Sequence, residues 1–102
     1  MQNERILCAA IWYKHVNPRS SHRPINTPGG VVLCGYRHGD IIAQVLPLVG
    51  ERQYTLGEHV QGFLTSKNRF VDRIEAWTIA EQEGQIIKKL SGNNILYSEN
   101  LY

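Results

Sequence analysis

The sequence predicts an α+β fold in a single domain, residues 1–102, with a small antiparallel β-sheet packed against two α-helices. Short apolar or β-branched segments bounded by turn residues indicate strands. Two other segments carry helical signals, one in the spacing of its apolar residues and one in a capping signature. A chain of 102 residues that is 42% apolar and 20% charged has the composition of a folded protein with one modest core.

The first expected element is a strand, and a long loop follows it. Residues Arg5–Tyr13 form a continuous apolar run, which favours a buried central strand, although length alone does not exclude a helix. Residues Lys14–Gly30 contain three prolines and a Gly-Gly pair, so no regular element is expected there. Loops longer than about 12 to 15 residues are often functional, so this loop is a candidate lid.

The next two elements are a second strand and the first helix. Residues Val31–Gly35 are β-branched and apolar, and we expect them to pair with the first strand in antiparallel fashion. Residues Tyr36–Val49 place their apolar side chains on one face of a helix. Asp40 suits the positive end of the helix dipole, and Pro47 is expected to kink or end the helix.

The second half of the chain predicts another strand and helix. We expect a strand at Val60–Leu64. Asp72 and Glu75 form a D-x-x-E signature that marks the beginning of the second helix, and Gly84 supplies its end. In the remaining segment, Ile95–Tyr97 is expected to form a short last strand.

Charge and cysteine content limit the classes of function. A net charge of +2 is too small for a general nucleic-acid binder, so DNA is not an expected partner. Cys8 and Cys34 lie among apolar residues without a Cys-x-x-Cys pair, and we interpret both as small core residues of a protein in a reducing compartment. No apolar run approaches the ~20 residues that span a bilayer, and the beginning of the chain lacks a secretory pattern, so a cytoplasmic protein is expected.

Two polar turns carry positive charge close to the beginning of a helix. A helix N-terminus with nearby cations favours phosphate, so two such turns side by side would bind a diphosphate or a cyclic phosphodiester. The alternative is that each arginine forms an ordinary surface ion pair. The first turn holds Tyr36, Arg37 and His38, and the second holds Lys67, Asn68, Arg69 and Phe70 ahead of Arg73.

Aromatic residues near these turns are candidates for stacking on a nucleobase, which contributes about 1 to 3 kcal/mol per base. Trp12, Tyr36 and Phe70 are the residues that we expect to contact a ligand. Phe63 and Trp77 lie inside apolar segments and are expected to fill the core.

Histidines raise the possibility of a metal site or of catalysis. His15, His22, His38 and His59 lack the spacing of a zinc site, so neither a metal nor another cofactor is expected. His38 could act as a general acid or base with a carboxylate such as Asp40 or Glu58, but no nucleophile accompanies it in the sequence.

Several blocks, taken in order along nearly the whole chain, resemble a family of small phage and prophage proteins that is similar to the Thoeris anti-defence sponges. The blocks are Ala9–Tyr13, Cys34–His38, Gly62–Ser66, Asn68–Val71 with Arg73, Glu75–Ala76, Gly84–Gln85, Leu96–Glu99 and Leu101–Tyr102.

The resemblance implies sequestration of a cyclic nucleotide immune signal, namely cyclic ADP-ribose isomers and in some cases cyclic oligonucleotides, without cleavage. It also implies action in the cytoplasm of an infected bacterium by a homo-oligomer, a dimer or a larger assembly up to a hexamer, with pockets at subunit contacts. The expected ligand contacts in the matching blocks are Arg37, His38, Asn68, Arg69 and Phe70. The loop matches only loosely, and His22 and Arg23 are its candidate lid residues.

Two other classes of function remain open from the sequence. One is a nucleotide-processing enzyme, a phosphodiester or glycosidic hydrolase that uses His38 with a carboxylate. The other is a small interaction module whose arginine-rich turns meet an acidic protein partner.

Overall fold

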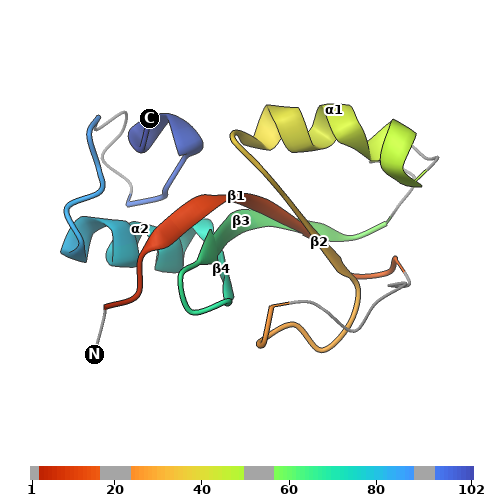
Figure 1. The fold of residues 1–102 in the computed structure, drawn as a ribbon, viewed down its shortest axis with the longest axis horizontal. Coiled ribbons are helices and arrows are strands. Elements are labelled where there is room, and N and C mark those ends of the chain that lie inside the picture. The colour runs from red at the N-terminus through yellow and green to blue at the C-terminus, as the bar shows by residue number, and fades with distance from the viewer. Residues whose placement is uncertain (1–2, 17–23, 50–56, 89–93) are drawn as a thin grey trace.

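The computed structural model describes residues 3–16, 24–49, 57–88 and 94–102, and its strands run through the middle of the molecule in Figure 1. The strands form one antiparallel sheet in the order β2-β1-β3-β4. The predicted α+β class is therefore confirmed. The elements in chain order are β1 (Ile6–Tyr13), β2 (Val31–Gly35), α1 (His38–Val49), β3 (His59–Thr65), β4 (Phe70–Asp72), α2 (Arg73–Gln82) and the 3₁₀-helix η2 (Ser98–Asn100).

β1 is a central strand, as its apolar sequence predicts. Successive side chains of a strand point to opposite faces, and alternate residues of β1 enter the core beside residues of α1 and α2. Both helices therefore cover the same face of the sheet, while the C-terminal segment lies between the beginning of α1 and α2 (Figure 1). The core cluster consists of Ile6, Ala9, Ile11, Tyr13, Ile41, Val45, Phe63, Val71, Ala76, Trp77, Ala80 and Leu96.

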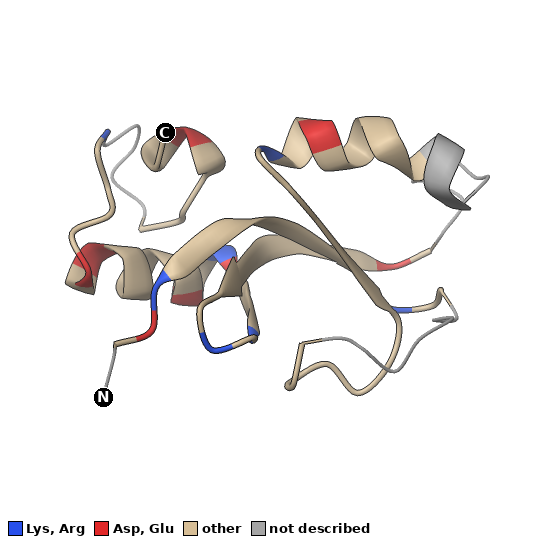
Figure 2. Cartoon of the chain, viewed as in Figure 1, with Lys and Arg blue, Asp and Glu red and all other residues tan. Residues whose placement is uncertain are grey.

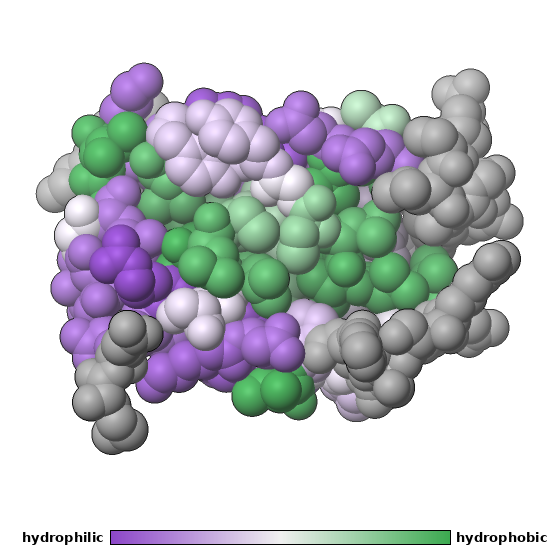
Figure 3. All heavy atoms as spheres, viewed as in Figure 1, coloured by the Kyte–Doolittle hydropathy of each residue, from purple (hydrophilic) through white to green (hydrophobic). Residues whose placement is uncertain are grey.

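No helix within the described residues covers the opposite face of the sheet (Figure 1). Figure 3 shows green, apolar side chains over the strands in the middle of the molecule. Cys34 lies on this face and is exposed, and Cys8 is partly exposed. The expectation that both cysteines are core residues is therefore wrong, because both lie outside the core cluster, with Cys34 exposed on the edge strand β2.

The helices differ from the sequence prediction mainly in their ends. α1 begins at His38 and continues past Pro47 to Val49, so the proline does not end it. α2 begins where the capping signature predicts, because the Asp72 carboxylate accepts hydrogen bonds from the backbone N–H groups of Ile74 and Glu75 at 3.1 and 2.8 Å. No helix in the described part of the chain combines the length and the apolar character needed to cross a bilayer.

A short strand replaces the expected direct passage from the second polar turn into α2. Residues Phe70–Asp72 form β4 and pair with β3 at Gly62, Phe63 and Leu64. The turn at Lys67–Arg69 therefore closes a β-hairpin and does not open a helix.

The described half of the long loop is attached to the outer edge of β4. The Asn26 amide bonds both the N–H and the C=O of Phe70, at 2.8 and 2.6 Å, and the Ile25 N–H donates to the Asn68 carbonyl at 2.8 Å. These contacts satisfy backbone hydrogen-bonding groups at the edge of the sheet that could otherwise pair with a strand of another chain. The expected lid residues His22 and Arg23 lie outside the described residues.

The C-terminal segment adds no strand to the sheet at Ile95–Tyr97, although it is described there. Leu96 is buried instead, and its N–H donates to the Arg73 carbonyl at 2.9 Å. The segment then turns into η2 and brings its last residues to the beginning of α1 (Figure 1).

Candidate functional site

Arg37 connects the turn before α1 to the C-terminal segment. Its guanidinium donates to the Tyr102 carbonyl and has one nitrogen, Nη1, 3.6 Å from the Glu99 carboxylate. The same group lies over the rings of Tyr36 and Tyr102, 5.2 and 5.5 Å from their centroids. Nη1 is buried and finds no hydrogen-bond acceptor among the described residues. Nη1 of Arg37 therefore has a long ion pair with Glu99 but no hydrogen bond, beside two aromatic rings.

The two tyrosines next to Arg37 form a stacked pair. The ring centroids of Tyr36 and Tyr102 are 4.3 Å apart, and the Tyr102 hydroxyl donates to the Tyr36 carbonyl. Tyr36 is 60% exposed. An aromatic surface is thus held in place by its neighbour and remains open to a planar ligand.

His38 is buried below this turn. Its Nε2 lies 2.7 Å from the Gly62 carbonyl, which can only accept, so Nε2 carries the proton and donates. Burial lowers the pKa of His38, and the ring meets the Phe63 ring edge-on with centroids 5.0 Å apart. Gly62 also pairs with Asp72, the residue that caps α2. The beginnings of both helices therefore converge on Gly62.

Arg73 is the first residue of α2, and its side chain extends toward the C-terminal segment and β3. Its guanidinium donates to the Leu96 carbonyl at 2.9 Å and to the Gln61 side chain at 2.6 Å, and it lies 4.7 Å from the Tyr97 ring centroid. Burial lowers the pKa of Arg73, and the negative charge of Glu99 opposes that change. Glu99 acts on His38 in the same direction.

The structure thus brings together four of the residues expected from the sequence, Tyr36, Arg37, His38 and Arg73. Glu99 is close to both arginines and to the histidine, and the two C-terminal tyrosines complete the group. We call it the arginine–tyrosine cluster, and it consists of Tyr36, Arg37, His38, Arg73, Tyr97, Glu99 and Tyr102.

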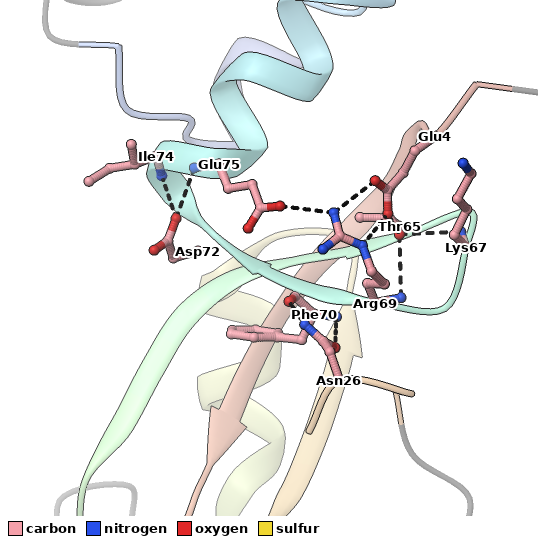
Figure 4. Close-up of polar contacts among 9 residues, drawn as sticks. All are labelled: Glu4, Asn26, Thr65, Lys67, Arg69, Phe70, Asp72, Ile74 and Glu75. Carbon is pink, nitrogen blue, oxygen red and sulfur yellow. Dashed lines mark hydrogen bonds and ion pairs between the residues drawn. The ribbon is translucent and has the colours of Figure 1, made fainter. Parts of the chain in front are cut away.

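Arg69 belongs to a separate network, shown in Figure 4. Its guanidinium donates two hydrogen bonds of 2.8 Å to the Glu4 carboxylate and one of 2.8 Å to Glu75. The hydrogen bonds from Arg69 are the main reason why the pKa of Glu4 is lowered to about 2. Thr65 donates to the same carboxylate at 2.6 Å. Arg69 therefore joins the N-terminal residues to the hairpin and to α2.

The remaining expected contacts also lie at the hairpin or on the uncovered face of the sheet. Asn68 has a φ of 57° and is the left-handed residue of the hairpin turn. Phe70 is buried at 6% exposure and meets the Trp12 ring edge-on, with centroids 5.8 Å apart. Within the described residues, no hydrogen bond, ion pair or ring contact joins these three residues to the arginine–tyrosine cluster.

Sequence reasoning missed the contribution of the C-terminal segment. Tyr97, Glu99 and Tyr102 enter the cluster from residues far along the chain from Arg37. A possible signal was the density of tyrosines around an acid in the last six residues, YSENLY.

The carboxylates considered for catalysis do not meet His38. Asp40 accepts from the Arg37 N–H at 3.1 Å, and Glu58 lies 3.8 Å from Lys14 and 3.9 Å from His15. Neither is hydrogen-bonded to His38. Among the described residues, no group of three or more His, Cys, Asp and Glu side chains is placed to hold a metal ion.

Basic residues lie at several separate turns in Figure 2, among acidic ones, and form no stripe along the face shown. The N–H groups of His38 and Gly39 lie in the first turn of α1, where an α-helix provides no acceptor of its own. A small anion is therefore better suited to this surface than a nucleic-acid backbone.

A family model described as phage T4 y16D protein matches residues 5–102 of the chain. No curated protein and no solved structure matches it.

Proposed function

The chain belongs to the phage T4 y16D protein family, and we propose that it is an anti-defence protein that binds a cyclic nucleotide immune signal and sequesters it without cleavage. The expected ligands are cyclic ADP-ribose isomers, with cyclic oligonucleotides as a second class. The supporting observation is the buried Nη1 of Arg37, which has an ion pair with Glu99 at 3.6 Å but no hydrogen bond, beside the exposed ring of Tyr36.

The chemistry of the arginine–tyrosine cluster supports this ligand class. A phosphate group would displace the Glu99 carboxylate from Arg37. This ion pair is long, at 3.6 Å, and the Glu99 side chain is 55% exposed. It would also accept from N–H groups in the first turn of α1, which have no acceptor within the helix. A nucleobase stacked on Tyr36 would contribute about 1 to 3 kcal/mol.

The burial and the hydrogen bond of His38 favour sequestration of the ligand over its hydrolysis. Its proton-bearing nitrogen is occupied by the Gly62 carbonyl, and the histidine is 7% exposed. A general acid or base must reach the proton that it transfers. We therefore propose that the protein is not an enzyme.

We also propose that the ligand-binding form is a homo-oligomer in the cytoplasm of an infected bacterium. Large apolar side chains that are more than half exposed support self-association. They are Leu7, Ile25, Ile74 and Ile87.

The test is incubation of the protein with cyclic ADP-ribose isomers and cyclic di- and trinucleotides, followed by removal of free ligand, denaturation and mass spectrometry. A sequestering protein retains the ligand through the wash and returns it intact. Recovery of a hydrolysed product would instead support the enzyme, and failure to retain any nucleotide would overturn the proposal.

A further inference from the structure

Cys8 of β1 and Cys34 of β2 are neighbours on the uncovered face of the sheet. The register pairs Ala10 with Cys34, so Cys8 is the diagonal neighbour of Cys34 on the same face. The two side chains also influence each other, because each is the main cause of the other's pKa shift, which lowers the pKa of Cys8 and raises that of Cys34. Two strands thus hold two sulfur atoms together outside the core.

The surroundings leave the pair free to react. Cys34 is exposed and Cys8 is partly exposed, and neither belongs to the core cluster or to the arginine–tyrosine cluster. β2 is an edge strand of the sheet. Only one of its long sides is hydrogen-bonded within the sheet, and closing a bridge between diagonal neighbours requires a backbone adjustment at this strand.

We propose that Cys8 and Cys34 form a redox-active thiol pair, which a small-molecule disulfide such as oxidised glutathione converts to an intramolecular disulfide. The proposal is independent of the nucleotide ligand. The interaction with Cys34 supports it, because this interaction is the main reason why the pKa of Cys8 is lowered to about 7. A thiolate is the form of cysteine that attacks a disulfide.

The reaction balances in two exchanges. The Cys8 thiolate attacks one sulfur of the external disulfide, whose S–S bond breaks, and the first thiolate leaves with the electron pair and takes a proton from solvent. Cys34 then loses its proton and attacks the Cys8 sulfur, which expels the second thiol. Two protein thiols are oxidised by two electrons, and one external disulfide is reduced to two thiols.

The experiment exposes the folded full chain to oxidised glutathione and measures its intact mass without reductant. The expected product is a single chain that has lost two hydrogens and carries no glutathione. Retained glutathione on the wild-type chain, disulfide-linked chains, or thiols that stay unmodified while the denatured chain reacts would each overturn the proposal.

Single-thiol variants separate an internal bridge from two independent reactions. In Cys34→Ser the second exchange cannot occur, so Cys8 is expected to keep glutathione as a mixed disulfide. Circular dichroism shows whether this variant is folded, and the wild-type mass decides the question if it is not. A folded Cys34→Ser chain that keeps no glutathione would contradict the assignment.

Discussion

At the scale of single residues, the arginines of this chain are held by partners from distant segments. Arg69 binds Glu4 across 65 positions, and Arg37 binds Tyr102 across the same separation. The two differ in how the guanidinium is used. Every guanidinium hydrogen bond of Arg69 ends on a carboxylate, whereas Nη1 of Arg37 has only an ion pair with Glu99 and no hydrogen bond. The first arrangement stabilises the fold, and the second is suited to a ligand.

The Glu4–Arg69 pair predicts a pH-dependent stability. The pKa of Glu4 falls from 4.5 to about 2 on folding. A lowered folded pKa means that the stabilisation is complete above pH 4.5 and is lost as the pH falls toward 2. We expect Glu4→Gln to lower the free energy of unfolding by about 1 to 2 kcal/mol at neutral pH, allowing for partial exposure of the pair.

Urea unfolding at several pH values measures this effect, with Glu81→Gln on the exposed side of α2 as the matched control. The cost of Glu4→Gln should shrink below pH 4.5. A cost that is the same at neutral and acid pH would show that Glu4 acts through packing and not through its charge.

The Cys34 thiol is expected to control the reactivity of Cys8. Without its donor, the pKa of Cys8 should rise from about 7 toward the ordinary 9.0. The rate of iodoacetamide alkylation of Cys8 at neutral pH should then fall about tenfold or more in Cys34→Ala, which leaves no donor at this position. A pH profile of alkylation that is identical in the wild type and in the variant would argue that the thiols do not interact.

At the scale of elements, the secure parts of the sequence prediction were those with local signals. The apolar run of β1 and the D-x-x-E cap of α2 each act within a few residues, and both are found where the sequence places them. β4 was missed because its three residues become a strand only through pairing with β3 and through the Asn26 amide. Such contacts link distant segments and leave no periodicity in the sequence.

The cap of α2 provides a test at this scale. Asp72→Ala removes both side-chain hydrogen bonds to the first turn and should lower the free energy of unfolding by about 1 kcal/mol, which thermal unfolding measures. Thr78→Ala, at an exposed site of the same helix, is the control. Equal melting temperatures for the two variants would mean that the cap contributes nothing beyond helix propensity.

At the scale of the whole molecule, the sequence predicted four of the seven residues of the arginine–tyrosine cluster. Tyr36, Arg37, His38 and Arg73 meet because the beginnings of both helices converge on Gly62. Arg69 was expected to join them and instead lies in the Glu4 network, because β4 separates its turn from α2.

Self-association is also a property of the whole molecule. We expect light scattering during size-exclusion chromatography to give the mass of a dimer or a larger assembly, because exposed apolar side chains are costly to leave in water. A chain that is monomeric at every concentration and still retains nucleotide would remove the oligomer from the proposal and leave the binding site intact.

The most direct test of the central claim is calorimetric titration of the retained cyclic nucleotide into the wild type, Arg37→Ala and Arg5→Ala. Arg5 is an exposed arginine outside the arginine–tyrosine cluster and serves as the matched control. Loss of a charged hydrogen-bond donor predicts an affinity about 10 to 100 times weaker for Arg37→Ala, with the affinity of Arg5→Ala unchanged. Equal affinities for a folded Arg37→Ala chain and the wild type would contradict the account.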